Sequence, residues 1–564
     1  MPSTHHFYYL HNFLFAMDWL RARYEDVLDE PQRRFLSEFQ QLPLLAQALL
    51  VRLLLRRGPW FLQGKLAYEE IPDLCAAAAP LLERGFLEAQ HPMGLDALFA
   101  LHTKAELLPL FPCAPIHAAM RKPQMLEALR AQHPVEQTYS AWNPQSQQDA
   151  WRVMVGELCE RLRLMFFGNL HQSWAEFVLA DLGIFKYEKV QIDEASRVFE
   201  RRADVDCYLA IHRCRQALGA GEMPETLLLE AARCSSPNPW LEARRAKLLL
   251  RIGQACERAQ DWELAHQAYD QCGYAGARHR RMRVLERTGR FVEAFALAQT
   301  ADAAPESEEE SQLLARMLPR LQRRLEQTVG RGGVHQPAVP TVREDIALEK
   351  PVEPTPVECL LRDCLHSEPA PVFYVENALI NALFGLLCWP AIFAPLPGAF
   401  FHPFQSGPAD LGAPDFVLRR KAEFDACLAL LADGRYRGVI RQRFVDKHGV
   451  QSPFVFWGAL TPELLDLALG CIPAEHLGLI FKRMLAGIKA NRTGFPDLVR
   501  FWPAERRYAL VEVKGPGDKL QDNQIRWLHY FSEHGIPASV CHVRWRETPE
   551  AQQAKSPDGW MVGA

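Results

Sequence analysis

Hydrophobic residues recur at helical spacing through most of the first 335 positions, and the pattern changes only nearer the C-terminus. Leu42 to Leu55 is strongly apolar at this spacing, which predicts a helix that ends at Arg56-Arg57-Gly58. Trp60-Phe61-Leu62 favours a short strand, and Ile71 to Leu87 predicts a second helix that Gly85 interrupts. Residues 1–92 therefore predict a helical N-terminal domain similar to a winged helix, with either a packing or a DNA-contacting role.

Short apolar helices are expected next, at Leu95–Leu101, Ala105–Phe111 and Met125–Arg130. Thr103 and Glu106 have the spacing of a capping box, which predicts that a helix begins between them. Residues 93–140 look like a SAP-type helical hairpin, a small module that binds the DNA backbone.

Residues 141–335 are predicted to be almost entirely helical, and they contain an internal repeat. Trp262, with an alanine three residues later, recurs as Phe291 with its own alanine, 29 positions along the chain. The spacing is slightly shorter than the roughly 34 residues of a tetratricopeptide repeat. We therefore expect stacked helix pairs with an extended surface.

A run of basic residues lies between the two copies of the repeat. It could be a solvated helix face, which is the usual explanation of such a run, or a track for DNA phosphates. The arginines that would form the track are Arg278, Arg280, Arg281 and Arg283.

Gly330-Arg331-Gly332-Gly333 and five prolines mark the stretch before residue 357. Such a composition disfavours regular structure, so residues 336–356 are predicted to be a proline-rich linker. Beyond it, helices are followed by short apolar strands, which indicates an α/β domain over residues 357–564.

Charged residues with a spacing suited to catalysis stand in this last domain. Gly494-Phe495-Pro496 introduces Asp497 at the mouth of one predicted strand, and Gly515-Pro516-Gly517 stops a second strand that begins near Tyr508. Side chains alternate along a strand, so Glu512 and Lys514 share one face. Burying such charges is costly unless they have partners.

Asp497 and Glu512 could hold a divalent cation, because carboxylate oxygens are the ligands that Mg²⁺ or Mn²⁺ prefers. The carbonyl of Val513 can add a further oxygen. Lys514 fits a group that orients or deprotonates the attacking water and offsets charge on a phosphate. An aspartate followed 15 positions later by Glu-x-Lys is the PD-(D/E)xK nuclease arrangement, although Glu-x-Lys alone is usually a cross-strand salt bridge.

Two further polar residues lie on predicted apolar stripes. Glu376 shares a helical face with Leu379 and Leu383 in a helix expected from Phe373 to Trp389. It would either complete the metal site or simply stand near the helix N-terminus, where the helix dipole favours an acidic side chain. Gln524 lies on the inward stripe of a helix expected from about Asp518 to His534.

Composition is ordinary, with 48% hydrophobic and 23% charged residues and a net charge of −4, so a DNA enzyme must gather its arginines and lysines on one surface. The 14 cysteines show no zinc spacing and are expected to be reduced. Met1 to Tyr24 lacks the pattern of an export signal, and Ala378 to Pro395 predicts a buried helix rather than a membrane span. We expect a cytoplasmic, nucleoid-associated protein.

Thr493 to Val499, Val511 to Leu520 and Gln524 to Leu528 closely resemble the VRR-NUC domain of the Fanconi-associated nucleases. Glu376 to Trp389 resembles the family helix that carries the first metal-binding acid. The family resemblance extends over nearly the whole chain, from the helical N-terminus through the SAP-like and tetratricopeptide-like parts to a restriction-endonuclease-like C-terminal domain.

The resemblance implies a Mg²⁺- or Mn²⁺-dependent nuclease that cuts 5′-flap and branched DNA, degrades it in the 5′→3′ direction and acts in interstrand-crosslink repair. It assigns Glu376, Asp497, Glu512 and the Val513 carbonyl as ligands, Lys514 as the base or charge stabiliser, and Gln524 as a supporting contact. The alternatives are a Holliday-junction resolvase and a helical-repeat scaffold that only binds DNA.

The family also has a basic pocket for the DNA 5′-phosphate. Lys489 and Arg492 are positioned to contribute to it, and Arg244, Arg245 and the arginine run are further candidates. Animal members carry a ubiquitin-binding zinc finger. No cysteine precedes Cys75 here, so we expect that module to be absent, which favours a bacterial origin, and we expect a monomer.

Overall fold

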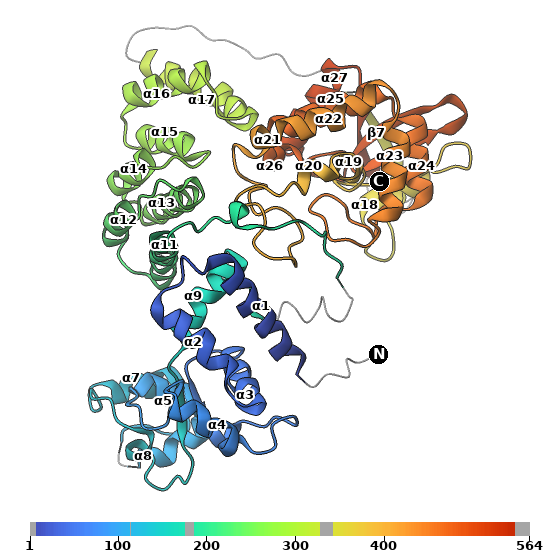
Figure 1. Ribbon diagram of the computed structural model, residues 1–564. Coiled ribbons are helices and arrows are strands. Elements are labelled where there is room, and N and C mark those ends of the chain that lie inside the picture. The colour runs from blue at the N-terminus through green and yellow to red at the C-terminus, as the bar shows by residue number, and fades with distance from the viewer. Residues whose placement is uncertain (1–6, 113, 175–184, 327–341, 547–564) are drawn as a thin grey trace, which may run out of the picture. The chain divides into compact units, whose positions relative to one another are not determined.

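The computed structural model describes residues 7–112, 114–174, 185–326 and 342–546. By their contacts these residues group into two compact units. The first comprises the described parts of Met1–Tyr187, Gln191–Tyr208 and Phe401–Phe404, and the second those of Glu188–Val190, Leu209–Phe400 and Gln405–Ala564. Figure 1 labels the elements along the chain.

Three helices open the first unit: α1 (Tyr8–Tyr24), α2 (Glu30–Gln40) and α3 (Leu44–Leu54). Helix α2 begins where the Asp29 carboxylate accepts a hydrogen bond from the Gln32 backbone N–H at 2.9 Å, which satisfies one of the free donors at a helix start. Helix α3 confirms the apolar helix predicted from the sequence, and its central residues are buried.

A three-stranded antiparallel sheet follows in the order β1-β3-β2, with β1 at Trp60–Leu62, β2 at Leu87–Glu88 and β3 at Ala150–Val153. Strand β1 is the predicted one, and helix α4 (Leu74–Glu83) lies between β1 and β2. Strand β3 is an exception within the segment that was predicted to be almost entirely helical. A run of four residues is too short for a period of two to stand out.

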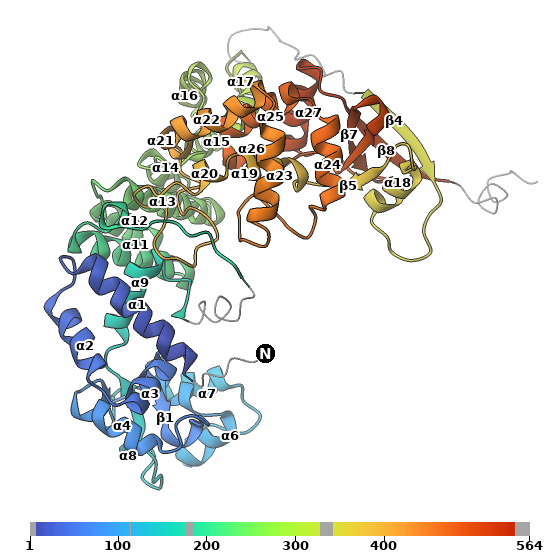
Figure 2. The same cartoon turned by 45° about the vertical axis from the view of Figure 1, so that its right-hand side comes forward.

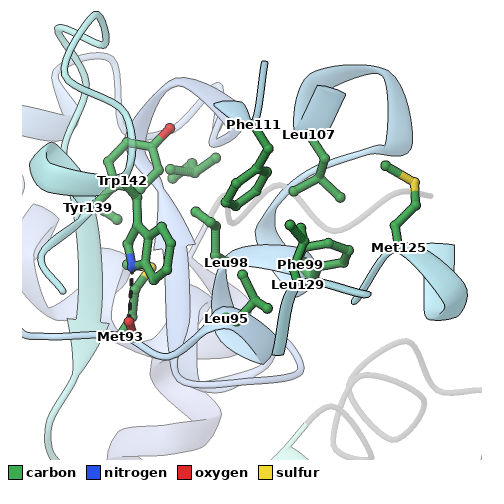
Figure 3. Close-up of a cluster of buried hydrophobic side chains, with 12 residues drawn as sticks. Met93, Leu95, Leu98, Phe99, Leu107, Phe111, Met125, Leu129, Tyr139 and Trp142 are labelled. Atoms are coloured by element: carbon green, nitrogen blue, oxygen red, sulfur yellow. Dashed lines mark hydrogen bonds between the residues drawn. The ribbon is translucent and has the colours of Figure 1, made fainter. Parts of the chain in front are cut away.

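Helices α5 (Leu95–Leu101), α6 (Lys104–Leu107), α7 (Lys122–Arg130) and α8 (Tyr139–Trp142) form the SAP-like part. The predicted capping box of Thr103 and Glu106 is present at α6. Figure 3 shows the core of this part, where the Trp142 indole N–H donates a hydrogen bond to the Met93 carbonyl at 3.0 Å. Burial of Leu98 and Leu129 among the aromatic side chains stabilises the helices against one another.

Helix α9 (Gly156–Phe167) ends at Gly168, which has a φ of +67°. A Cβ atom at this glycine would lie 2.6 Å from the Phe401 ring, so only glycine allows the later segment to approach so closely. His402 is buried against Phe166 and Phe167, which explains why Phe401–Phe404 belongs to the first unit.

Helical repeats occupy the middle of the chain. Helices α14 and α16 begin at Trp262 and Phe291, the two aromatic residues of the predicted repeat, and both following alanines, Ala265 and Ala294, are fully buried. Consecutive helices contact one another from α12 to α17 (Figure 1). The helices are α11 (Arg202–Ala220), α12 (Pro224–Arg233), α13 (Pro239–Ala259), α14 (Trp262–Asp270), α15 (Ala277–Arg287), α16 (Phe291–Ala303) and α17 (Glu308–Glu326).

A five-stranded mixed sheet forms the centre of the C-terminal part, in the order β4-β8-β7-β6-β5. Strands β5, β6 and β7 are antiparallel neighbours, whereas β8 pairs in parallel with β7 and with β4. Figure 2 labels β4, β7 and β8. The strands are β4 (Val342–Leu348), β5 (Val372–Tyr374), β6 (Leu498–Trp502), β7 (Arg507–Lys514) and β8 (Ala538–Trp545).

Strand β4 corrects the prediction of a linker without regular structure over residues 336–356. Positions 336–341 lie outside the described residues, but Val342–Leu348 is an edge strand paired with β8 along its whole length. Pro340 and Pro351 flank this strand rather than interrupt it, so every residue of the strand keeps its backbone N–H. Charged, exposed side chains are common on such edges.

Most helices of this part lie between β5 and β6. Helix α19 buries every one of its residues, which confirms a buried helix within Ala378 to Pro395. The helices are α18 (Val357–Leu365), α19 (Leu379–Leu387), α20 (Trp389–Ile392), α21 (Phe416–Arg419), α22 (Lys421–Ala432), α23 (Tyr436–Asp446), α24 (Pro462–Cys471), α25 (Ala474–Ala486), α26 (Ile488–Asn491) and α27 (Asp522–Glu533).

The two faces of the sheet differ. Val511 and Val513 belong to an apolar cluster with Leu361 of α18 and Cys541 of β8. Side chains alternate across a strand, so Glu512 and Lys514 must point to the other face. The prediction that these two charges share a face is confirmed by the register of β7.

No single helix within the described ranges is long and apolar enough to cross a membrane. The one described pair that is long and apolar enough when taken together, α24 with α25, is bent by 105°. No disulfide joins the cysteines of the described residues, and most of these cysteines are buried.

Candidate active site

The β6–β7 hairpin brings two carboxylates together. Leu498 of β6 pairs with Val511 of β7, and continuing this antiparallel register by one residue places Asp497 opposite Glu512. Directly opposed residues on one face have Cβ atoms about 5 Å apart. Asp497 is 8% exposed and Glu512 is 0% exposed, so two negative charges meet in a largely dry position.

Backbone hydrogen bonds fix Asp497 at the start of β6. Its carboxylate accepts a hydrogen bond from the Val513 N–H at 2.8 Å, and its carbonyl accepts one from the Val375 N–H at 2.8 Å. Burial raises the pKa of Asp497 to about 6 despite the bond from Val513. Asp497 is therefore held in one orientation between strands β5 and β7.

Glu512 has unusual surroundings for a buried acid. The Lys514 Nζ lies 2.8 Å from Glu512 Oε1 as an ion pair, but it lacks the alignment of a hydrogen bond, and neither carboxylate oxygen has a hydrogen-bond donor among the described residues. Burial, and after it the charge of Asp497, raise the pKa of Glu512 to about 7. A native protein rarely leaves such oxygens unsatisfied.

Glu376 does not lie on a helix, contrary to the prediction for Phe373 to Trp389. Residues Val372–Tyr374 form strand β5, and helix α19 starts at Leu379, so Glu376 stands in the turn between them. Its exposed carboxylate accepts a hydrogen bond from the Tyr374 hydroxyl at 2.5 Å. The apolar spacing continues through strand, turn and helix, and for that reason the sequence did not reveal the break.

Within the described ranges, no three Asp, Glu, His or Cys side chains are gathered closely enough to hold a metal ion. Two acids are opposed, and the negative charge of Glu376 is near enough to raise the pKa of both. The residues nonetheless suit a divalent cation, because the unsatisfied oxygens of Glu512 and the carboxylate of Asp497 are hard ligands on one face. To act as a third ligand, the Glu376 side chain would have to rotate away from Tyr374.

Asn377 supports the loop that carries Asp497, and sequence reasoning did not single it out. Its backbone has a φ of +51°, and its side-chain oxygen accepts hydrogen bonds from the N–H groups of Gly494 and Phe495 at 2.9 and 3.2 Å. An asparagine directly after Glu376 was the available signal, because asparagine tolerates positive φ and readily bonds to nearby backbone.

Gln524 lies in the first turn of α27, which begins at Asp522, later than the predicted start at Asp518. Its side-chain oxygen accepts a hydrogen bond from the Gln521 N–H at 2.8 Å and thereby caps the helix. In this position Gln524 orders the segment after Gly515-Pro516-Gly517.

Lys489 and Arg492 differ in what they contact. The Lys489 Nζ lies 3.2 Å from the Tyr274 hydroxyl and lines an open pocket of about 410 Å³ together with Asn523 and Arg526. The Arg492 guanidinium donates to the Pro453 carbonyl at 2.6 Å, and burial lowers its pKa. Lys489 is the more accessible of the two to a ligand.

Most of the arginines proposed for a phosphate track are paired with acids. Arg278 pairs with Glu310, Arg280 with Glu257, Arg281 with Asp270 and Arg245 with Glu242. Arg244 lies over the Trp240 ring, with its guanidinium carbon 3.2 Å from the centroid. Arg283 is exposed, and no ion pair is formed by it within the described residues.

Known families match three segments of the chain. The VRR-NUC domain matches residues 431–545, the FAN1 HTH domain matches residues 7–88, and the Fanconi anemia-associated nuclease SAP domain matches residues 92–142. The first segment contains the β6–β7 hairpin with both opposed acids.

Whole proteins and a solved structure are similar to this chain over nearly its full length. The Fanconi-associated nuclease 1 homolog of Pseudomonas aeruginosa is 51% identical over 540 residues, which cover 96% of each chain. Human Fanconi-associated nuclease 1 is 23% identical over 96% of this chain and 63% of its own length. The crystal structure of paFAN1 bound to 2nt 5′flap DNA with gap superposes with a TM-score of 0.91 at 50% identity and covers 97% of this chain and 100% of that one.

Proposed function

The chain belongs to the family of the Fanconi-associated nucleases, and we propose that it cuts DNA carrying a 5′ flap, degrades it in the 5′→3′ direction and serves the repair of interstrand crosslinks. It is a DNA nuclease that depends on a divalent metal ion. The observation that carries the proposal is the pair of opposed, buried acids beside Lys514. The proposed ion is Mg²⁺ or Mn²⁺, since the ligand atoms are all oxygens.

Glu376, Asp497, Glu512 and the carbonyl of Val513 would hold the ion. When bound, such an ion lowers the pKa of a coordinated water and neutralises charge on the phosphate. Asp497 supplies a carboxylate that Val513 already orients, and Glu512 supplies two oxygens that accept no hydrogen bond from the described residues, with the Lys514 ammonium group as the ion-pair partner of Oε1. The Tyr374 hydroxyl holds the Glu376 carboxylate until that side chain turns toward the other acids.

Lys514 is the charged donor at this site. It is 8% exposed and directed to the same face as both acids, with its Nζ 2.8 Å from Glu512. A lysine so placed orients the attacking water or donates hydrogen bonds to a phosphate oxygen as negative charge develops there. Its place at the end of β7, directly before Gly515, leaves its ammonium group next to the opening of the hairpin.

Contacts to DNA would come from the SAP-like part and from Lys489. Lys489 lies in α26, a few residues before Asp497, and its ammonium group faces an open pocket. We propose that this pocket contacts a phosphate of the substrate. Arg492 would stabilise the segment before Asp497 through its hydrogen bond to the Pro453 carbonyl. The reaction would take place on the bacterial chromosome, in the cytoplasm, by a monomer.

A substrate panel tests the function. End-labelled 5′-flap, 3′-flap, four-way-junction and single-stranded DNAs are each incubated in Mn²⁺ with the wild type, with Asp497→Ala or with Asp466→Ala. Asp466 serves as the control because it is an exposed aspartate that pairs with Arg441 on the surface. We expect the wild type and Asp466→Ala to cut the 5′ flap, and Asp497→Ala to bind it without cutting. Full-rate cutting by Asp497→Ala would overturn the site, and preferred cutting of the junction would point to a resolvase instead.

A further inference from the structure

The helical repeats contain a basic pocket away from the carboxylate pair. It has a volume of about 510 Å³ and is lined by residues of α13, α14 and α15. This volume lies within the roughly 300–1,000 Å³ typical of small-ligand sites. Its lining consists of Gln254, Glu257, Arg258, Trp262, Arg280, Arg283, Val284 and Arg287.

The charge of the pocket is strongly positive, with four arginines against one glutamate. The glutamate, Glu257, is already paired with Arg280 at 3.0 Å and accepts a hydrogen bond from the Tyr269 hydroxyl. Arg258, Arg283 and Arg287 are exposed, and they make no ion pair with any described residue. Three guanidinium groups that line one pocket, beside a single carboxylate that is already paired, form a site for an anion.

The contrast with the neighbouring arginines makes this arrangement informative. Along the same helix, Arg278 and Arg281 are each bound to an acid. Glu286, which stands next to Arg287 in sequence, pairs instead with Arg320 of α17. Glu286, the acid of α15, is therefore not available to neutralise Arg283 and Arg287 of the same helix.

An aromatic ring lies beside these cations. Trp262 starts α14 and lines the pocket, with the Arg287 guanidinium carbon 6.0 Å from its ring centroid. In the other copy of the repeat, Phe291 packs against the apolar core instead. An indole that remains on a polar pocket offers a flat surface on which a nucleobase can stack.

We propose that this pocket is a second nucleic-acid site, in which Arg258, Arg283 and Arg287 bind a phosphate and Trp262 stacks on the attached base of a nucleotide. The ligand is a nucleotide unit, supplied either by a single-stranded segment of DNA or as a free nucleoside monophosphate released by the nuclease. The assignment rests on the proposed function only for the choice of DNA over other anions.

Binding is measured on the full chain by fluorescence anisotropy in EDTA, so that no strand is cut. The probe is a labelled single strand of about ten nucleotides, within the site size of known single-strand binders. The double variant Arg283→Gln/Arg287→Gln is compared with Arg213→Gln/Arg215→Gln, which removes two exposed arginines from α11. We expect about a tenfold loss of affinity for the first pair and less than about a twofold loss for the second.

The aromatic residue is tested separately. Trp262→Ala should weaken binding by about tenfold, whereas Trp262→Phe should restore most of it, because a phenyl ring still stacks. A 2-aminopurine base in the probe should lose fluorescence with the wild type and keep it with Trp262→Ala. Circular dichroism melts of the variants show whether the helices remain folded.

Competition with deoxyadenosine monophosphate distinguishes the two sources. Displacement at equal nucleotide concentration assigns the pocket to a free nucleotide, and failure to displace assigns it to a strand; both results support the site. Equal losses in the two double variants, or no loss in either, would overturn it. Wild-type cleavage of a gapped duplex with a one-nucleotide flap is measured in parallel, and its failure would count against the proposed nuclease function alone.

Discussion

Glu512→Gln should make the nuclease domain more stable in EDTA while abolishing its activity. The carboxylate of Glu512 is fully buried, and its oxygens lack hydrogen-bond donors among the described residues. The folded protein raises its pKa from 4.5 to about 7, so the charged form is disfavoured by folding. The substitution removes that charge and leaves a side chain of the same size.

The magnitude follows from linkage between protonation and folding. Each difference of one in pKa corresponds to about 1.4 kcal/mol, so the change from 4.5 to about 7 amounts to roughly 3 kcal/mol. Below pH 4.5 the acid is protonated in both states and costs nothing. Stability is then lost as pH rises from about 4.5 to about 7, because over this range the unfolded state has released the proton that the folded state still holds.

Hydrogen exchange of the β7 amides in EDTA measures this local stability without requiring the whole chain to unfold at once. From pH 5 to pH 8, the wild type should lose about 2–3 kcal/mol relative to Glu512→Gln. Glu505→Gln, an exposed acid that pairs with Arg507 in the same hairpin, should follow the wild type. Mn²⁺ should then stabilise the wild type and not Glu512→Gln. The same pH dependence in all three proteins would refute the reasoning.

Lys514→Ala should slow single-turnover cleavage by about a hundredfold or more, and Lys514→Arg should recover only part of it, because removal of one preorganised donor has this cost. Gly494→Ala should destabilise the loop before β6 by about 1–3 kcal/mol, since φ is +91° and the added Cβ would lie 2.9 Å from the Asn523 backbone; an unchanged melting temperature would contradict it. Asp410→Ala should cost about 3–5 kcal/mol in thermal unfolding, because it leaves the fully buried Arg420 without its carboxylate; a loss below about 1 kcal/mol would show that water reaches the arginine.

The sequence was sufficient for the hairpin because local rules agree there. Gly494 and Pro496 precede one strand, Gly515-Pro516-Gly517 follows the other, and alternation between them assigns Glu512 to one face. Short-range signals of this kind are independent of the rest of the fold. That Asp497 and Glu512 lie opposite each other depends only on the register of the two neighbouring strands β6 and β7.

Sequence reasoning failed where distant residues decide. Strand β4 exists because β8, almost two hundred positions later, offers it a parallel partner. Glu376 leaves the predicted helix because β5 pairs with β6 immediately before it. The arginine run contains mostly structural ion pairs, and acids on other helices, such as Glu257 and Glu310, determine which arginines remain available. Hydrophobic periodicity within one segment gives no information about these distant partners.

The position of Lys514 explains how two buried acids can persist before an ion binds. Without a positive charge nearby, the opposed carboxylates would repel each other across the hairpin at low dielectric. The Lys514 ammonium group, on the same strand and face as Glu512, offsets part of this repulsion and lowers the pKa of both acids relative to burial alone. A bound cation would take over that role and leave Lys514 available to the phosphate. In the proposed site the same lysine would therefore stabilise the resting acids and would serve as a catalytic donor only when an ion is bound, which would couple ion binding to activation.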